Sequence, residues 1–139
     1  MTDAMPASER AAIEAACARL ARAFCVFSDA RDDARYEALF TPDARFSRPG
    51  EETVGAGAIA AALRDRPAEA RVRHLSMDPV VDVLDAGNAQ GSGTLIVARA
   101  GADGVPAAPV WGDYRDHYVL VDGAWRISVR EVSLSFAAP

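Results

Sequence analysis

The spacing of apolar residues changes once along the chain, at about Arg71, and this change limits the possible folds more than any other feature. Before it, apolar residues recur every three or four positions, as in helices that bury one face. After it, long runs rich in Val, Leu, Ile and Tyr are joined by short turns, as in antiparallel strands. Helices followed by a meander of strands predict an α+β domain, with the helices packed on one face of the sheet.

Three helices are expected before Arg71. Ser8 is the expected N-cap of the first, whose apolar face includes Cys17, Leu20 and Phe24. Asp32 is the expected cap of a short second helix. The expected helices span 8–28, 32–40 and 59–66, with a short strand at 44–48.

Four long strands are expected after Arg71. The first contains Pro79, which has no N–H to donate and therefore predicts a bulge or an edge position. Asp122-Gly123 is a strong signal for a two-residue hairpin turn. The expected strands span 72–84, 89–100, 110–121 and 124–136, with a longer loop at 101–109.

Composition limits the class of protein. With 139 residues, half of them hydrophobic, the chain predicts one domain over 1–139, and residues 1–7 are expected to be flexible. A net charge of −5 disfavours nucleic-acid binding, and the absence of Lys excludes a lysine Schiff base. No signal peptide or membrane span is recognised. Cys17 and Cys25 are expected to be reduced, and a cytoplasmic location is expected.

Two titratable residues stand out from their surroundings. His74 lies on an otherwise apolar or small-polar strand, and Asp29 lies at the end of the first helix, where the helix dipole disfavours a carboxylate. Brought together in a pocket, they would form a general-base dyad. The alternatives are a buried structural histidine bound to one backbone carbonyl and an aspartate in an exposed turn.

Alternation along the strand 110–121 places Tyr114, Asp116 and Tyr118 on one face and His117 on the other. The first three would line a pocket or form half-buried cross-strand pairs. His117 is expected to be exposed or at a subunit interface. These faces disfavour a metal site built from His74, His117 and a carboxylate, so neither a metal nor another cofactor is expected.

Four segments, taken in order, resemble the SnoaL-like branch of the nuclear transport factor 2-like superfamily. They are FSDARDDARYEALFTPDARF (27–46), VGAGAIAAAL (54–63), RHLSMDPVVDV (73–83) and GDYRDHYVLVDGAWRISVRE (112–131). The resemblance implies a curved antiparallel sheet, wrapped by the three helices into a cone with an internal apolar pocket. It also implies a homodimer.

The resemblance also implies roles for particular residues. In several lyases of this family an Asp at the end of the first helix pairs with a His on the first long strand, which falls on Asp29 and His74. An Arg that often points at substrate falls on Arg130, whose alternative role is an ion pair with Asp116, Glu131 or a partner subunit. The expected pocket residues are Phe24, Tyr36, Phe40, Tyr114, Asp116 and Tyr118.

The resulting hypothesis is a small, cofactor-free enzyme that acts on a hydrophobic small molecule by elimination, isomerisation or cyclisation. The alternative is a non-catalytic ligand-binding or assembly module, like the small subunits of ring-hydroxylating dioxygenases. One departure from the lyase pattern bears on this choice. Several catalytic relatives carry a tyrosine on the first helix, where this chain has Phe24 and Phe27, and Tyr36 on the next helix is the nearest substitute.

Overall fold

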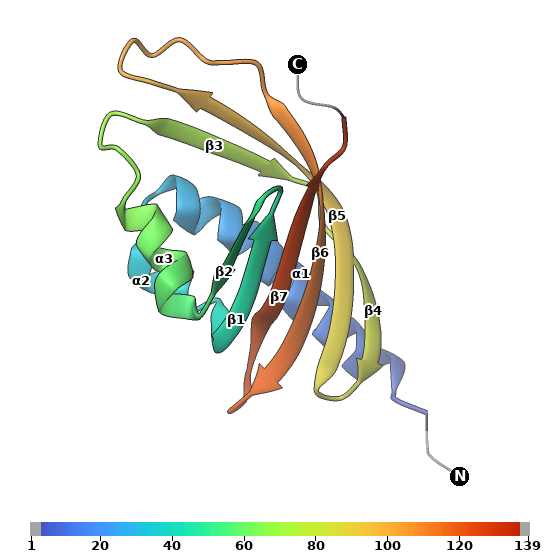
Figure 1. Ribbon diagram of the computed structural model, residues 1–139. Coiled ribbons are helices and arrows are strands. Elements are labelled where there is room, and N and C mark those ends of the chain that lie inside the picture. The colour runs from blue at the N-terminus through green and yellow to red at the C-terminus, as the bar shows by residue number, and fades with distance from the viewer. Residues whose placement is uncertain (1–3, 137–139) are drawn as a thin grey trace.

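In the computed structural model, which describes residues 4–136, three helices pack against one seven-stranded sheet (Figure 1). Residues 1–3, part of the segment expected to be flexible, lie outside the described residues. The elements in chain order are α1 Ala7–Asp29, α2 Asp33–Glu37, β1 Phe40–Arg48, β2 Glu51–Val54, α3 Ala56–Arg64, β3 Arg71–Ser76, β4 Val80–Asp85, β5 Asn88–Ala100, β6 Val110–Val121 and β7 Ala124–Leu134.

The sheet has the order β2-β1-β7-β6-β5-β3, and β4 pairs with the other half of the long strand β5. All neighbouring strands are antiparallel except β1 and β7, which are parallel. The sheet curves without closing, α1 runs along its concave face, and α2 and α3 pack together beside β1 (Figure 1). The predicted α+β class and the cone-like architecture are therefore confirmed. None of the helices in residues 4–136 is both long and apolar enough to cross a membrane.

Several element boundaries differ from the prediction. The helix α1 has Pro6 rather than Ser8 at its N-cap, so Ser8 lies in the first turn and caps nothing. The interruption expected at Pro79 in the strand 72–84 is confirmed: the segment forms two strands, β3 and β4, because a residue without an N–H cannot continue the ladder. The strand β2 was missed because it is short and mostly exposed, so no alternation of apolar and polar residues marks it.

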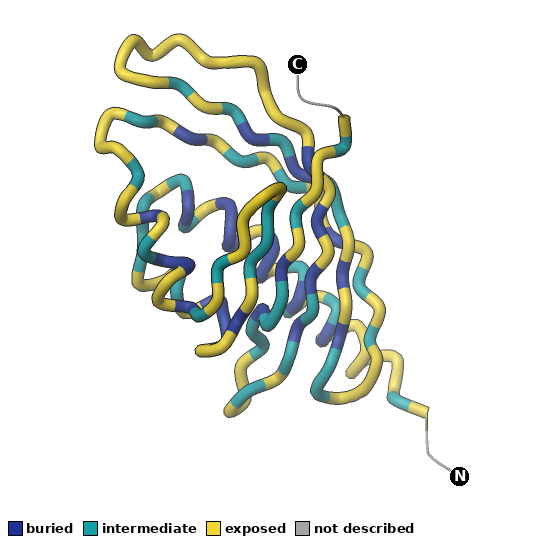
Figure 2. The backbone as a smooth tube through the Cα atoms, viewed as in Figure 1, coloured by how far each residue is buried: buried dark blue, intermediate teal, exposed yellow. Residues whose placement is uncertain are grey.

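The core lies between α1 and the lower part of the sheet, where the buried residues of both elements face each other (Figure 2). Residues from one stripe of α1 pack against inward-facing residues of β1, β6 and β7. The largest buried side chains there are those of Leu20, Phe24, Phe40, Tyr118 and Ile127. Burying side chains of this size contributes about 1.5–3 kcal/mol each, which makes this layer the main source of stability.

Two glycines on β5 leave room for tyrosines of the next strand. A Cβ atom at Gly93 would lie 2.6 Å from the hydroxyl of Tyr114, and one at Gly91 would lie 2.8 Å from the ring of Tyr118. Side chains essentially never approach a Cβ atom this closely. The glycines therefore let both tyrosine rings lie flat against the sheet beneath α1.

Gly93→Ala is expected to lower the free energy of unfolding by about 1–3 kcal/mol, because the new methyl group displaces the Tyr114 ring from a packed layer. Urea denaturation measures the change. Gly101→Ala is the matched control, since nothing lies within 4 Å of the added Cβ there, and its effect should stay within about 0.5 kcal/mol. Equal effects of the two substitutions would contradict this account of the sheet.

Candidate active site

The structure brings Asp29 and His74 into direct contact. Asp29 is the last residue of α1 and His74 lies in the middle of β3. One carboxylate oxygen of Asp29, Oδ1, lies 2.6 Å from the His74 ring nitrogen Nδ1. The other, Oδ2, accepts a hydrogen bond of 2.9 Å from the backbone N–H of His74. Both oxygens are therefore used to fix the same residue.

This contact determines which ring nitrogen of His74 carries the proton. A carboxylate can only accept a hydrogen bond, so Nδ1 must be protonated, which leaves the lone pair on Nε2 in the neutral ring. Nε2 has no hydrogen-bond partner within residues 4–136. Burial lowers the pKa of His74 below 6.5, although the hydrogen bond and charge of Asp29 act in the opposite direction. At neutral pH the ring is therefore uncharged and able to accept a proton at Nε2.

His74 lies in the wall of a cavity of about 620 Å³, which is in the range of small-molecule sites. Its inner wall is largely apolar and comes mainly from α1, α3, β1, β3 and β5. The main apolar lining residues are Phe24, Phe46, Ile59, Leu63, Val72, Leu95 and Val97. The Phe24 ring contacts the His74 ring edge-on, with 6.0 Å between their centroids. The aromatic residues therefore do not fill the interior solidly, and open space reaches His74.

Tyr36, on α2, also lines this cavity and packs against Phe24 at a centroid distance of 5.2 Å. Its hydroxyl makes no hydrogen bond to any described residue. Burial raises the pKa of Tyr36 to about 12, so the hydroxyl keeps its proton at neutral pH. The chain thus places a neutral donor in the same cavity as the His74 ring.

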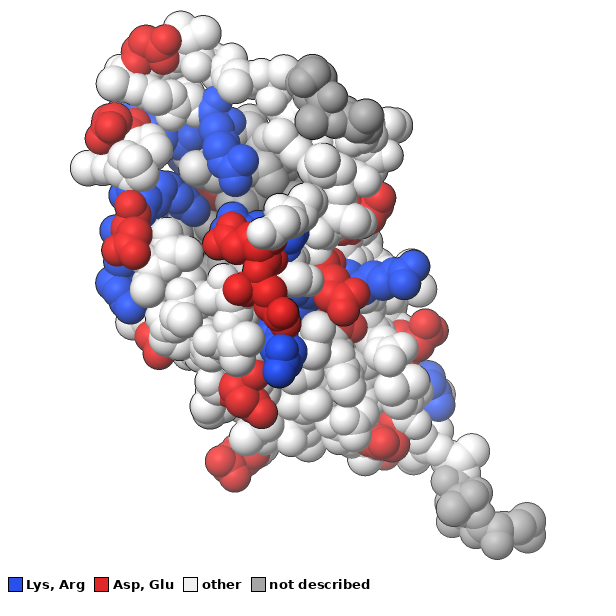
Figure 3. Space-filling model, in the orientation of Figure 1, with Lys and Arg blue, Asp and Glu red and all other residues white. Residues whose placement is uncertain are grey.

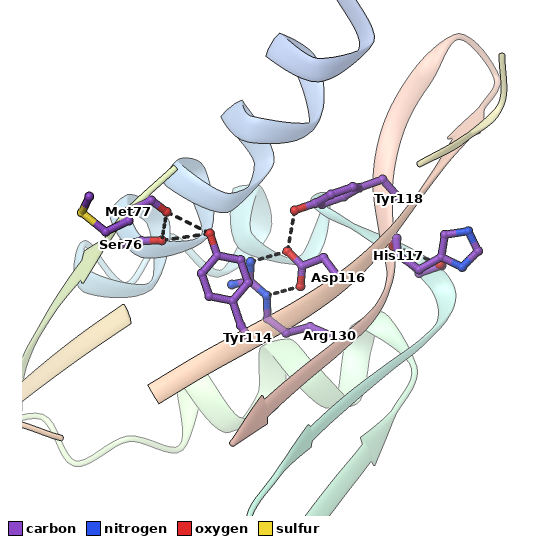
Figure 4. A network of polar contacts seen from close by, with 8 residues as sticks. Ser76, Met77, Tyr114, Asp116, His117, Tyr118 and Arg130 are labelled. Atoms are coloured by element: carbon purple, nitrogen blue, oxygen red, sulfur yellow. Dashed lines mark hydrogen bonds and ion pairs between the residues drawn. The ribbon is translucent and has the colours of Figure 1, made fainter. Parts of the chain in front are cut away.

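Arg130 is fully buried and forms a bidentate ion pair with Asp116, with contacts of 2.7 and 2.6 Å (Figure 4). Burial acts to lower the pKa of Arg130, but the Asp116 carboxylate outweighs this effect and raises it above the usual value. The guanidinium carbon lies 4.2 Å from the ring centroid of Phe24 and 4.7 Å from that of Tyr114. Arg130 does not line the cavity, and its ion pair with Asp116 is the alternative left open by the sequence.

Four of the six expected pocket residues lie outside the cavity wall. Asp116 accepts a 2.7 Å hydrogen bond from Tyr118, and Tyr114 donates one of 2.9 Å to the backbone carbonyl of Met77 (Figure 4). Phe40 packs edge-on against Tyr36 behind the wall. The difference arises because this part of the inner sheet face is covered by α1. Only Phe24 and Tyr36 of the expected set line the cavity.

The other reactive side chains contribute nothing to this site. The His117 side chain points away from the Asp116 network, on the opposite side of β6 (Figure 4). Cys17 and Cys25 are free and buried, and burial raises their thiol pKa values to about 12 and 11, so both are unreactive neutral thiols. Within residues 4–136 no group of three or more His, Cys, Asp or Glu side chains is arranged to hold a metal ion.

The arginines that line the cavity were not among the pocket residues predicted from the sequence. Arg66 and Arg99 both line it, from the segment after α3 and from the inner face of β5. A signal for Arg99 was present, because alternation along β5 places it on the same face as Leu95 and Val97. A charged residue on the same strand face as buried apolar residues indicates either that the strand leaves the core there or that the core contains a polar site.

Asp116→Ala is expected to lower the free energy of unfolding by about 3–5 kcal/mol, because it leaves the Arg130 charge buried without its partner. Thermal or urea denaturation measures the loss. Asp113→Ala on the same strand is the control, since that exposed carboxylate makes one exposed hydrogen bond and should matter by less than about 1 kcal/mol. Similar losses in the two variants would show that the buried pair does not support the fold.

The pKa of His74 in the folded protein is expected to lie below 6.5, and Asp29→Asn should lower it further, because the Asp29 carboxylate acts to raise it. An NMR titration of the two histidine rings measures both values, and His117→Ala assigns the resonances. A wild-type value above 6.5, or an upward shift in Asp29→Asn, would contradict the geometry described above.

Comparison with known proteins places these features in a family. The family model described as a SnoaL-like domain matches residues 9–131. A scytalone dehydratase-like protein from Novosphingobium aromaticivorans superposes with a TM-score of 0.85 at 20% identity, covering 94% of this chain and 89% of that one. Hexachlorocyclohexane dehydrochlorinase LinA-type3 from Novosphingobium barchaimii superposes with a TM-score of 0.84 at 18% identity, covering 96% and 94%.

ActVI-ORFA from Streptomyces coelicolor is a third structural neighbour, with a TM-score of 0.74 at 23% identity, covering 89% of this chain and 98% of that one. Curated protein sequences include no match to the chain. At these identities the structural neighbours show the fold alone. The family model spans most of the sequence, and the chain therefore belongs to the family of SnoaL-like domains.

Proposed function

We propose that this protein is an enzyme in which His74 removes a proton from carbon in a cyclic, largely apolar substrate. One observation carries the proposal: Asp29 holds the Nδ1 side of the His74 ring, while Nε2 has no partner among the described residues and the ring lies in the wall of a cavity. A neutral imidazole oriented by a carboxylate is the usual arrangement of a general base.

The proposed reaction begins when a C–H bond next to a carbonyl, or next to a carbon with a leaving group, gives its proton to Nε2 of His74. The electron pair of that bond forms a carbon–carbon double bond as the leaving group departs, or is held as an enolate. The Asp29 carboxylate stabilises the imidazolium that results. The proton on Nε2 then passes to the leaving group or to another carbon of the substrate.

Tyr36 is the proposed hydrogen-bond donor to the oxygen that becomes negative. Its hydroxyl is neutral, lacks a partner among the described residues and belongs to the same cavity as His74. Donors placed where charge develops are often the largest single contribution to catalysis. Tyr36 would thus replace the tyrosine that several relatives carry on the first helix.

Elimination is the reaction type that the neighbours favour, because a dehydratase and a dehydrochlorinase both remove a proton together with a leaving group. The competing proposal is a ligand-binding module without catalysis. An interior packed solid by aromatic residues would have supported that module. The cavity of about 620 Å³ that reaches His74 supports the enzyme.

Deuterium exchange at the acidic carbon of 2-tetralone in heavy water, followed by NMR, tests proton abstraction without knowledge of the natural substrate. We expect the wild-type protein to accelerate exchange about 10²-fold or more over buffer, and His74→Ala to lose nearly all of this acceleration. Asp29→Asn should lose at least about tenfold, because the proton is no longer fixed on Nδ1.

The matched control is His117→Ala, which removes the other histidine on the opposite face of β6 and should leave exchange unchanged. Circular dichroism on each variant verifies that the fold is intact. Exchange that persists in folded His74→Ala would refute the proposed base.

A further inference from the structure

The cavity that contains His74 has an unusual excess of positive charge in its wall. Four arginines line it, Arg48, Arg66, Arg71 and Arg99, together with two acidic residues. Figure 3 shows blue side chains gathered around a hollow on this face of the molecule. The chain as a whole has a net charge of −5, so the composition alone does not account for this local excess.

The arginines differ in how their charges are neutralised. Arg48 is paired with Glu51 at 2.8 Å. Within residues 4–136, the other three have no carboxylate oxygen within 4.0 Å. The wall of the cavity therefore holds three arginines that form no ion pair with any carboxylate in the described part of the chain.

Arg66 is fixed rather than free to move with solvent. It donates hydrogen bonds of 3.1 Å to the backbone carbonyl and to the hydroxyl of Ser28, the next-to-last residue of α1. Arg31 in turn holds the backbone around Arg66 through its carbonyl, at 3.0 Å, and through those of Pro67 and Ala70. Hydrogen bonds to the backbone therefore hold both Arg31 and Arg66 near the C-terminal end of α1, where Asp29 lies.

Arg99 approaches the same space from the sheet. In the ladder between β3 and β5, His74 pairs with Val97 and Val72 pairs with Arg99. Diagonal neighbours on one sheet face are about 7–8 Å apart, so Arg99 is within reach of a ligand that contacts His74. Arg99 is exposed and Arg66 half-buried, which places these charges toward the mouth and the apolar residues deeper inside.

The electrostatics of the base agree with this placement. Burial is the main cause that lowers the pKa of His74, and the charges of Arg66 and Arg99 lower it further. Burial likewise lowers the pKa of Arg66, and the charges of Arg31 and Arg99 add to this effect, while Asp29 and Tyr36 act in the opposite direction. The unliganded site therefore carries repulsion among its cations, which an anion bound between them would relieve.

We propose that the substrate carries a carboxylate, held by Arg66 and Arg99 at the mouth of the cavity, while its apolar ring system extends inward with the reacting carbon at His74. Arginine suits this role because its planar guanidinium donates two parallel hydrogen bonds to a carboxylate. The position of the reacting carbon rests on the proposed function, but the anion site does not.

Calorimetric titration with 2-naphthoate and with its uncharged counterpart 2-naphthamide tests the anion site. We expect the wild-type protein to bind naphthoate about tenfold or more tightly than naphthamide, since hydrogen bonds to charged groups are the stronger ones. Raising the salt concentration should weaken only naphthoate binding. Naphthoate should also raise the pKa of His74 in an NMR titration, because the anion offsets the charges of Arg66 and Arg99.

Arg99→Gln should remove most of the preference for naphthoate without loss of fold, because Arg99 is exposed and makes no side-chain hydrogen bond or ion pair with a described residue. Arg115→Gln, an exposed arginine on β6 that does not line this cavity, is the matched control and should keep the preference. Equal binding of the two probes, no measurable naphthoate binding at millimolar concentration, or equal effects of the two substitutions would overturn the proposal.

The two proposals fail in different ways. A preference for naphthoate without exchange of 2-tetralone would keep the anion site and reject the base. Exchange without the preference would keep the base and reject the anion site. His74→Ala should retain the preference for naphthoate, because the carboxylate is held at the mouth and not by the dyad.

Discussion

The candidate site depends on the contact between the last residue of α1 and the middle of β3. The negative charge of Asp29 lies at the C-terminal end of α1, where the helix dipole is also negative. Its interaction with the dipole is therefore unfavourable and lowers the stability of the fold. Its two hydrogen bonds to His74, one to the ring and one to the backbone, offset that cost. The same contact joins segments 45 residues apart and sets the orientation of the ring in the cavity wall.

The interior divides into two parts that share one aromatic wall. Beneath α1 lies a closed polar network around Arg130 and Asp116, and it is fully buried. Beyond Phe24 lies the cavity with His74. Phe24 contacts both, since Arg130 lies over its ring and the His74 ring packs nearly perpendicular to it. A buried ion pair is weak evidence for added stability by itself, but here Arg130 contacts the same Phe24 ring against which His74 packs.

Much of the fold was predictable from local patterns. The helical periodicity, the Asp32 cap and the hairpin signals identified nearly every element, and β6 was predicted with the observed bounds, 110–121. The family resemblance supplied the pairing of a helix end with a strand histidine, and the two residues are in contact. The structure leaves the catalytic role of that pair as a proposal.

The residues of the cavity wall were not predictable from the sequence. Alternation shows which residues of a strand share a face, but it does not show which of them a helix covers and which face an open cavity. On β6, Gly112 lines the cavity, while Tyr114 and Asp116 on the same face lie beneath α1. On β5 the C-terminal end of the strand, with Val97 and Arg99, faces the cavity. Which half of each strand α1 covers is decided by the curvature of the whole sheet, a property that no single segment encodes.

The protonation of His74 can be read from the nitrogen-15 chemical shifts of its ring at neutral pH, which distinguish the two neutral tautomers from the imidazolium. The expected result is a neutral ring with the proton on Nδ1 and a free lone pair on Nε2, the less common tautomer, because Asp29 can accept only from a protonated Nδ1. A ring protonated on both nitrogens, or on Nε2 alone, would contradict it, since neither form presents a base to the cavity.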